Sequence, residues 1–334
     1  MNCADSGPDC VRDPGTALLD RAVDSLRSAD QGLKAVWIFP GLGSRFVGMG
    51  NDLFGKHPAA DELFREAEQV LGFSLESACL EGSGRKHVPA RQESQLIYTI
   101  SCGYAAALNA LNFKPTATAG HSLGNWAAGW AAGLYDFKTG LELVTHVEEL
   151  LEECIPEGMQ TMGVVIGLDE SVVKSLVAGY PNAWIANWNS PGQYVISGMA
   201  TEVDGFLSDA GGLQAKRAKR LPTDRALHTE LMHQVSERLR DRLKQVRWKE
   251  PSVPLVSSAD HRVMNTAEDA RGFFGTFLER SVCWESSARS IWQQFGSEFV
   301  EVGPGNVLSA MFPFIERSIT VRTASEQLEQ DQAA

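Results

Sequence analysis

The segment Gly120-His121-Ser122-Leu123-Gly124 carries the residue types of a nucleophilic serine site. In a Gly-x-Ser-x-Gly pattern between a strand and a helix, the glycines tolerate a sharp turn and the serine Oγ projects from it. The amide that follows the serine then faces a developing oxyanion. An apolar strand at 117–119 precedes the motif, and a helix rich in small residues follows it. The chain has 31 glycines, so an ordinary tight turn is the alternative. Together with its flanking elements, the motif predicts a catalytic serine.

A serine nucleophile needs a base, and the chain offers seven histidines. His228 follows the extended segment 221–227 and precedes a predicted helix, where a loop could present it to the serine. His121 lies within the turn itself, where its side chain is expected to point away from Ser122. His261, next to Asp260, is the alternative base if the chain is an ordinary α/β-hydrolase. The sequence thus favours His228 and leaves His261 open.

The elements that must position these residues indicate an α/β protein. Strands at 35–40 and 117–119 alternate with predicted helices at 95–111, 122–132 and 138–153, which is typical of a parallel sheet covered on both faces. Between 162 and 221 the predicted order is βαββαβ, the order of a ferredoxin-like subdomain. The α/β pattern then resumes with a predicted helix at 229–248 and strands at 254–257 and 298–302.

This order predicts an α/β hydrolase-like large subdomain with a parallel sheet and an inserted ferredoxin-like small subdomain. We expect the following divisions: an N-terminal extension at 1–33, the large subdomain at 34–158 and 222–324, the small subdomain at 159–221, and a disordered polar tail at 325–334.

Composition excludes several classes of protein. With 334 residues and 43% hydrophobic content, the chain can bury a large core. No apolar run approaches the roughly 18–20 residues that span a bilayer, and the polar N-terminus lacks the apolar core of a secretory signal, so we expect a cytoplasmic protein. The formal net charge of −12 disfavours binding to nucleic acid or to anionic membranes. The six cysteines include no CxxC pair, so we expect no metal site.

One segment is basic although the chain as a whole is acidic. Between 214 and 225 the sequence QAKRAKRLPTDR contains five basic residues, Lys216, Arg217, Lys219, Arg220 and Arg225. A basic surface on an acidic protein could dock an acidic partner. The alternative is a solvated edge strand that its lysines protect from aggregation.

Six motifs in the same order resemble the malonyl-CoA:acyl carrier protein transacylase family, the acyltransferases of fatty acid and polyketide synthesis. The resemblance spans about 35–322 and rests on Phe39-Pro40-Gly41-Leu42-Gly43-Ser44 with Gly48-Met49, Gln95, Gly120 to Gly124, Asn187-Trp188-Asn189-Ser190-Pro191-Gly192-Gln193, His228 with Leu231-Met232, and Glu301-Val302-Gly303-Pro304-Gly305. The family combines an α/β hydrolase-like large subdomain with a ferredoxin-like small one, in agreement with the predicted elements.

The resemblance implies a role for each matching residue. Ser122 is the nucleophile, and His228 acts as general base and then as general acid. A main-chain carbonyl, of Phe277 or a neighbour, orients the histidine in place of an aspartate. The backbone amides of Leu42 and Leu123 form the oxyanion hole. Gln95 and Asn189 are implied to contact the substrate.

The implied reaction is a ping-pong transfer with no bound cofactor. Ser122 attacks a phosphopantetheine thioester of coenzyme A or of an acyl carrier protein, and a second thiol then collects the acyl group. The implied partner is therefore an acyl carrier protein or carrier domain. The five basic residues between 216 and 225 would suit docking to an acidic carrier.

One departure from the family bears on the substrate. Members that transfer malonyl groups hold the free carboxylate with an arginine in the helix after the serine, and a gapless comparison places that position at Val147. No arginine lies between Arg91 and Arg217. The helix instead carries Glu142, Glu148, Glu149, Glu152 and Glu153. A guanidinium matches a carboxylate, whereas valine cannot hold one and glutamates repel one. Leu227, before the implied base, also suggests an altered acyl cavity.

We therefore predict a discrete acyltransferase of polyketide-type biosynthesis that moves an uncharged or amine-bearing acyl group. An acyl carrier protein hydrolase of the same fold is the alternative, with water in place of the second thiol. A third hypothesis, from another class, is a non-catalytic docking protein that keeps the fold, but intact Ser122 and His228 argue against it.

Overall fold

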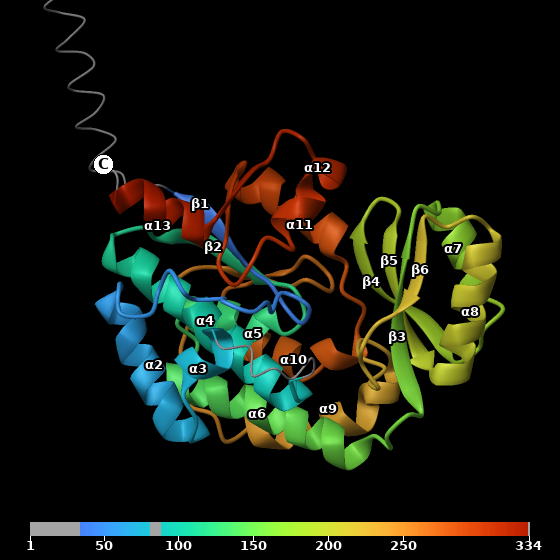
Figure 1. Ribbon diagram of the computed structural model, residues 1–334, viewed down its shortest axis with the longest axis horizontal. Helices are drawn as coiled ribbons and strands as arrows, with labels where there is room; N and C mark the ends of the chain where they lie inside the picture. Colours follow the sequence, from blue (N-terminus) through green and yellow to red (C-terminus); the bar gives the residue numbers. More distant parts are fainter. Residues whose placement is uncertain (1–33, 81–87, 333–334) are drawn as a thin grey trace, which may run out of the picture.

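The structure is a computed structural model that describes residues 34–80 and 88–332. The expected extension at 1–33 lies outside these residues. Figure 1 shows two lobes, one built around a six-stranded sheet and the other, on the right, around a four-stranded sheet. The predicted α/β fold with a second, smaller subdomain is therefore confirmed.

The large sheet has the strand order β10-β9-β1-β2-β7-β8. Its strands are parallel from β10 to β7, and β8 is antiparallel to β7. All five residues of β1 are buried, as its apolar sequence AVWIF requires of a central strand covered on both faces. The strands are β1 (Ala35–Phe39), β2 (Pro115–Gly120), β7 (Leu255–Val256), β8 (Val263–Met264), β9 (Glu298–Glu301) and β10 (Thr320–Thr323).

Two hydrophobic clusters cover the two faces of this sheet. Alternate residues of β1 point to opposite faces, so Trp37 and Phe39 join one cluster, and Val36 and Ile38 join the other. The helices that contribute to the first cluster are α2 (Pro58–Leu71), α3 (Leu75–Leu80), α4 (Ala90–Ala110), α5 (Gly124–Ala131), α6 (Phe137–Cys154), α9 (His233–Leu243), α10 (Ala267–Phe274) and α13 (Ala324–Gln332). Two helices contribute to the second, α11 (Trp284–Phe295) and α12 (Phe312–Ile315).

The small sheet is antiparallel throughout and has the order β4-β5-β3-β6. Numbered within the subdomain this order is 2-3-1-4, with a helix after the first strand and another after the third, as predicted for a ferredoxin-like unit. The elements are β3 (Gln160–Ile166), α7 (Glu170–Val177), β4 (Ala183–Ser190), β5 (Gln193–Met199), α8 (Ala200–Gly212) and β6 (Arg217–Arg220). They enclose a third hydrophobic cluster of their own.

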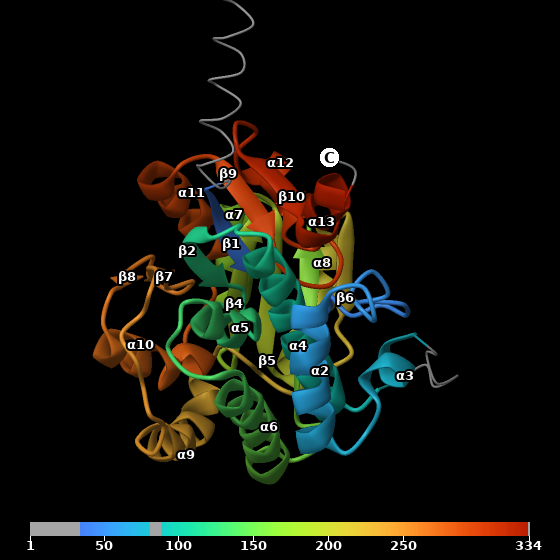
Figure 2. The ribbon, with the colours of Figure 1, turned by 90° about the vertical axis from the view of Figure 1, so that its left-hand side faces the viewer.

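The prediction of a disordered tail after residue 324 is wrong for the part that the structure describes. Residues 324–332 form α13, which lies beside β10 in Figure 2. Thr323 and Glu326 cap its start reciprocally, because each backbone N–H donates to the other residue's side chain. Ala324 and Leu328, four residues apart, are buried in the first hydrophobic cluster. Two apolar residues and a capping box thus hold a segment that is otherwise polar.

The predicted helix at 229–248 is also shorter than expected. A 3-10 turn at Glu230–Met232 precedes α9, which ends at Leu243. The short strands β8 and β10 were not predicted. None of the helices in the described ranges combines the length and the apolar character that crossing a membrane requires.

Candidate active site

Ser122 occupies the tight turn between β2 and α5, as predicted. Its φ is 52°, in the left-handed region that residues other than glycine seldom adopt. The flanking glycines are sterically required. A Cβ at position 120 would lie 2.2 Å from the backbone nitrogen of Asn125, and one at position 124 would lie 2.1 Å from the carbonyl oxygen of Phe39. The two glycines therefore let strand, turn and helix pack closely enough to present the serine.

His228 lies against this serine although 106 residues separate the two in the chain. The Oγ of Ser122 and the Nε2 of His228 are 2.7 Å apart, and both residues are buried. His228 also has a positive φ, of 64°. Strained backbone of this kind tends to occur at functional sites, where the surrounding structure maintains it.

Two main-chain carbonyls orient the imidazole from the other side. The Nδ1 of His228 lies 3.1 Å from the carbonyl oxygen of Phe277 and 3.1 Å from that of Arg280. Because carbonyls only accept hydrogen bonds, Nδ1 carries the proton, and Nε2 presents its lone pair to the serine hydroxyl. The backbone N–H of His228 donates to the carbonyl of Leu278, which fixes the residue to the same segment. This arrangement suits a serine and a histidine that work without a carboxylate.

Burial sets the charge of this histidine. Desolvation is the largest influence and lowers the pKa of His228 to about 4, and the nearby His121 lowers it further. The hydrogen bonds to the carbonyls of Phe277 and Arg280 oppose this effect. The imidazole is therefore neutral at pH 7, the form in which it can accept a proton from the serine.

The alternative base lies elsewhere. The Nδ1 of His261 is 3.0 Å from the Oγ of Ser287, and Asp260 pairs with Arg280 at 2.9 Å. Neither residue hydrogen-bonds to Ser122 or to His228. The hypothesis of an ordinary α/β-hydrolase that uses His261 is therefore wrong.

The loop after β1 lies directly beside the serine turn. A Cβ at position 41 would lie 2.5 Å from the carbonyl oxygen of His121 and 3.3 Å from the amide nitrogen of Leu123, so only glycine allows this approach. Within the described residues, no hydrogen bond occupies the amide of Leu42 or that of Leu123. Both amides are thus available to an oxyanion, as the resemblance implied. The side chain of Leu42 is 39% exposed at the rim of the site.

Asn189, which was predicted to contact the substrate, hydrogen-bonds to the turn that carries the serine. The Nε2 of His121 donates to the Oδ1 of Asn189 over 2.9 Å, and both side chains are buried. This bond ties β4 of the small subdomain to the residue before the nucleophile. The sequence motif identified Asn189, but no local sequence pattern predicts its hydrogen bond to His121.

A second tie joins β4 to the segment that orients the base. The N–H of Trp188 donates to the carbonyl of Val282, and the N–H of Val282 donates to the carbonyl of Ala186, each over 2.8 Å. Val282 follows closely on Phe277 and Arg280, whose carbonyls bond His228. One strand of the small subdomain therefore supports both the nucleophile and the base, an arrangement that the sequence did not reveal.

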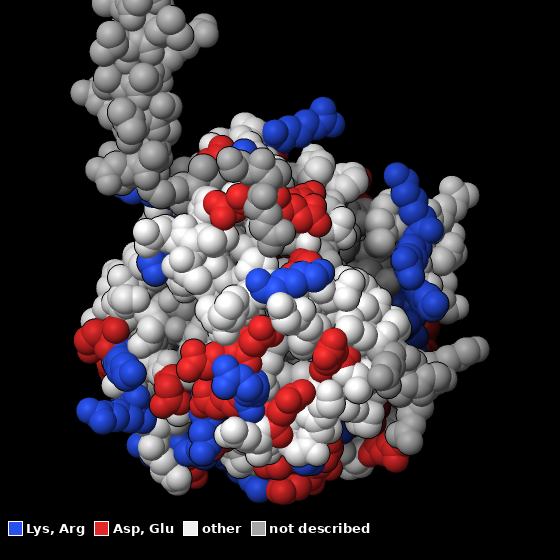
Figure 3. Space-filling model, turned by 60° about the vertical axis from the view of Figure 1, so that its left-hand side comes forward, with Lys and Arg blue, Asp and Glu red and all other residues white. Residues whose placement is uncertain are grey.

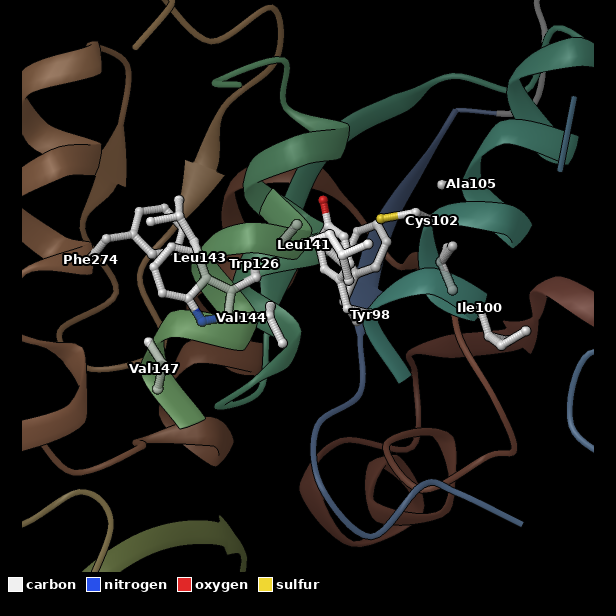
Figure 4. Packing of buried hydrophobic residues seen from close by; sticks show 14 of the residues in the cluster. Tyr98, Ile100, Cys102, Ala105, Trp126, Leu141, Leu143, Val144, Val147 and Phe274 are labelled. Carbon is white, nitrogen blue, oxygen red and sulfur yellow. The ribbon is translucent and has the colours of Figure 1, made fainter. Parts of the chain in front are cut away.

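The position expected to hold a carboxylate-binding arginine is apolar. Val147 is 6% exposed and belongs to the same hydrophobic cluster as Trp126, Phe274 and the buried Leu227. Figure 4 shows Val147 on α6 next to Leu143, on the side of Trp126 and Phe274. The indole of Trp126 stacks on the ring of Phe274 with centroids 4.4 Å apart. That substrate contacts Val147 or Leu227 stays a prediction.

Polar side chains lie next to this apolar position, between α4 and α6. The Nε2 of Gln95 donates to the Oγ1 of Thr145 over 2.9 Å, so the predicted substrate-binding glutamine is already paired within the protein. One turn along α6, the Oγ of Ser94 donates to the Oε1 of Glu148 over 2.6 Å. Glu148 is a buried residue, not part of a solvated helix face.

The basic surface predicted between 216 and 225 is present in part. Lys216, Arg217, Lys219 and Arg220 are exposed on or beside β6, an edge strand, and Figure 3 shows basic side chains gathered in a column on the right of the view. Including Arg225 in this surface is wrong, because its side chain is only 14% exposed and pairs with Asp224. Within residues 34–80 and 88–332, no group of three or more His, Cys, Asp or Glu could hold a metal ion.

Comparison with known proteins agrees with this geometry. The family model of the acyl transferase domain matches residues 36–313. The malonyl CoA-acyl carrier protein transacylase of Bacillus subtilis is 32% identical over 297 residues, which cover 88% of this chain and 94% of that protein. The transacylase of the same name from Escherichia coli is 31% identical and covers 87% of this chain and 95% of its own length.

Solved structures show the same fold. The malonyl CoA-acyl carrier protein transacylase of Coxiella burnetii aligns with a TM-score of 0.84 at 30% identity, over 89% of this chain and 96% of that one. A malonyl-transacylase solved in complex with a type II polyketide synthase acyl-carrier protein aligns with a TM-score of 0.83 at 28% identity, over 90% of this chain and 100% of that one. This chain therefore belongs to the acyl transferase domain family that contains the malonyl CoA-acyl carrier protein transacylases.

Proposed function

We propose that this protein is a discrete acyltransferase that moves an acyl group between thioesters of coenzyme A and of an acyl carrier protein. The observation that carries the proposal is the 2.7 Å hydrogen bond from Ser122 Oγ to the Nε2 of a neutral His228 that two carbonyls orient. The names of the relatives, which describe transfer to acyl carrier proteins, support the same reaction class.

Acylation follows from this geometry. The Nε2 of His228 takes the hydroxyl proton as Ser122 Oγ attacks the thioester carbonyl carbon. The oxyanion that forms faces the free amides of Leu42 and Leu123. When the tetrahedral intermediate collapses, the carbon–sulfur bond breaks and the phosphopantetheine thiolate leaves with the proton held by His228. The acyl group is then an ester of Ser122.

Deacylation is the same sequence in reverse with a second thiol. His228 takes the proton of the incoming phosphopantetheine thiol, and the thiolate attacks the ester carbonyl. Collapse of this intermediate breaks the bond to Ser122 Oγ, which regains its proton from His228. The phosphopantetheine thioester is thus substrate and product, and the protein's own residues perform every step without a cofactor.

We further propose that the transferred acyl group is uncharged or amine-bearing rather than malonyl. The support comes from Val147, a buried apolar residue where the resemblance places an arginine, and from the buried carboxylate of Glu148 beside it. Losing one buried charge-assisted pair costs about 2–3 kcal/mol, which corresponds to roughly two orders of magnitude in selectivity. The relatives' names specify malonyl transfer, so this proposal separates the chain from them.

The partner we propose is an acyl carrier protein with an acidic face, in a polyketide-type pathway. The exposed side chains of Lys216, Arg217, Lys219 and Arg220 along β6 provide the complementary charge. The polyketide synthase carrier bound to one structural relative supports this type of partner.

The experiment is intact-protein mass spectrometry after brief exposure to malonyl-CoA or, separately, to butyryl-CoA, with Ser122→Ala as the control. We expect a butyryl adduct on the wild type, no adduct on Ser122→Ala, and little malonyl adduct. Addition of a carrier protein bearing its phosphopantetheine thiol should then move the butyryl group to the carrier. Loss of the adduct as free butyrate, with no acylated carrier, would instead identify a hydrolase. A dominant malonyl adduct would contradict the proposed substrate.

A further inference from the structure

Asn187 on β4 carries a buried carboxamide oxygen that no described residue pairs. The residue is 7% exposed, and its Oδ1 is buried without a hydrogen-bond partner within the described ranges. An unpaired buried polar atom is costly, and most native proteins satisfy such atoms. None of the acyl-transfer steps uses this side chain. Asn187 is therefore a polar group that awaits a partner from outside the chain.

The pairing of the small sheet fixes the direction of this side chain. Asn187 lies opposite Val195 on β5, and residues that are opposite each other in a sheet point to the same face. Val195 belongs to the first hydrophobic cluster, which fills the large subdomain, whereas the next residue, Ile196, belongs to the cluster that α7 and α8 cover. Asn187 therefore faces the large subdomain, on the side of the small sheet away from these two helices (Figure 1).

Along β4, this face leads to the nucleophile. Asn189 lies two residues from Asn187 and bonds His121, the residue before Ser122, over 2.9 Å. Two residues of extended strand span at most about 7 Å. The carboxamide of Asn187 therefore lies a short distance from the serine turn.

Across the sheet, the same face leads to the base. Ser197, two residues beyond the residue opposite Asn187, donates from its Oγ over 2.8 Å to the carbonyl of Leu227, directly before His228. On the other side of β4, Asn187 forms a parallel bridge with Val282, which follows the carbonyls that orient His228. Contacts to the nucleophile and to the base thus surround Asn187, and its carboxamide faces the reactive pair from the small subdomain.

We infer that Asn187 binds the amide of the phosphopantetheine arm that lies nearest the thioester sulfur, and so positions the thioester for attack by Ser122. The inference rests on the proposed acyl transfer and deepens it. Two methylene groups separate the nitrogen of this amide from the sulfur, so a thioester at the serine brings the amide to the side that carries Asn187. The amide N–H donates to the Oδ1 of Asn187, and the amide carbonyl accepts from its Nδ2.

This site recognises the arm and not the acyl group. Every thioester of coenzyme A or of an acyl carrier protein has the same amide, so donor and acceptor bind in the same way. A thioester of similar shape without the amide N–H leaves the buried Oδ1 unpaired. Sites built to pair a polar group discriminate strongly against ligands that lack it.

The test uses butyryl thioesters of three thiols of similar shape. N-acetylcysteamine keeps the amide, 2-mercaptoethyl acetate has an ester oxygen in place of the N–H, and 4-methylpentane-1-thiol has neither N–H nor carbonyl. The kcat/KM for acylation of Ser122 is measured by thiol release, corrected for the reactivity of each thioester toward a free thiol, and checked by intact mass. We expect the wild type to prefer the N-acetylcysteamine thioester to the acetate by about fivefold or more.

Asn187→Leu keeps the size of the side chain and removes the amide. It should lower kcat/KM for the N-acetylcysteamine thioester about tenfold, and leave that for the 4-methylpentane-1-thiol thioester within about twofold. Asn187→Ala gives the same comparison if the leucine variant does not fold. Asn265→Leu changes an exposed asparagine between β8 and α10 and should leave all three rates unchanged.

The three thioesters separate binding of the arm from support of the fold. Equal losses with all three in Asn187→Leu would show that Asn187 only supports the structure, and unchanged rates would show that the arm binds elsewhere. Either result overturns the inference while the proposed acyl transfer stands. If no thioester acylates Ser122 in the wild type, the proposed function fails and this inference with it.

Discussion

The reactive pair, Ser122 and His228, is built differently from the proposed wall of the acyl site, Val147 and Leu227. At the pair, Ser122 and His228 bond each other, and the second nitrogen of His228 bonds two carbonyls. The proposed wall is apolar, because Val147 and Leu227 are buried in one hydrophobic cluster. The pair is held by hydrogen bonds that the free protein already makes, whereas the proposed wall offers apolar side chains.

This difference indicates that the reaction depends on the backbone around the pair, whereas selectivity for the acyl group depends on side chains. Ser122 and His228 both have positive φ, and glycines that no other residue can replace surround the serine, so few sequences can build this pair. The proposed wall residues, Val147 on α6 and Leu227 before His228, would act through their side chains, which can change without disturbing that backbone. The same acyl-transfer chemistry can therefore serve different acyl groups.

The largest effect should come from breaking the pair. Ser122→Ala should abolish the acyl-enzyme, and His228→Ala should slow its formation by about 10³-fold or more, because the serine then lacks its base. Rapid-quench mass spectrometry measures both. His261→Ala is the matched histidine control and should acylate at the wild-type rate, since His261 bonds Ser287 instead. A strong defect in His261→Ala would contradict the assignment of the base.

The pH dependence should separate the buried pair from exposed histidines. Desolvation lowers the pKa of His228 to about 4, and only the neutral form can accept the serine proton. As the pH falls through about 4, kcat/KM for acylation should therefore fall, and it should stay flat between about pH 6 and 8. Stopped-flow rates of thiol release from an acyl-CoA give the profile. A midpoint near 6.5, the ordinary value for an exposed imidazole, would contradict the burial of the base in the free enzyme.

A smaller effect should follow from loosening the support that β4 gives to the serine turn. Asn189→Ala leaves the buried Nε2 of His121 without its partner, which should cost about 1–3 kcal/mol of stability and slow acylation about tenfold. Thermal unfolding and single-turnover acylation measure the two effects. Asn189→Asp keeps the acceptor oxygen and should remain closer to the wild type in both. An Asn189→Ala variant that melts and reacts like the wild type would show that this bond has no supporting role.

The smallest effect should come from the oxyanion loop. Leu42→Ala keeps the backbone amide and removes only a half-exposed side chain, so acylation should change far less than the about 10²–10³-fold that loss of an oxyanion donor costs. The same single-turnover assay compares this variant with the wild type. A loss of about 10²-fold would contradict the expectation that position 42 acts only through its backbone amide.

The sequence predicted the pair because each part has a local pattern. The glycines around Ser122 lie between a strand and a helix. The ferredoxin-like order between 162 and 221 is visible because segments with the apolar spacing of strands alternate with segments that have the spacing of helices. The orienting carbonyl at Phe277 came from the resemblance. That the carbonyl of Arg280 shares this role could not be predicted, because main-chain atoms carry no residue-type signal.

The burial of Glu148 and Arg225 and the helix at 324–332 could not be predicted from the sequence, for a different reason. Glu148 stands among four other glutamates of α6, and only packing against Ser94 distinguishes it as buried. Arg225 stands among exposed basic residues, yet its side chain turns inward. Likewise, the burial of Ala324 and Leu328 depends on a cluster built by distant helices. Which member of a polar run is buried is decided by tertiary contacts, which composition and periodicity do not encode.

The most direct test of the comparison is a competition for Ser122. The protein is mixed with equal concentrations of malonyl-CoA and butyryl-CoA, quenched within one turnover, and the two adducts are quantified by intact mass. We predict that the butyryl adduct exceeds the malonyl adduct by about 10²-fold, because the pair is intact and the wall has no arginine at position 147. A malonyl adduct in excess would show that the wall has kept the selectivity of its relatives.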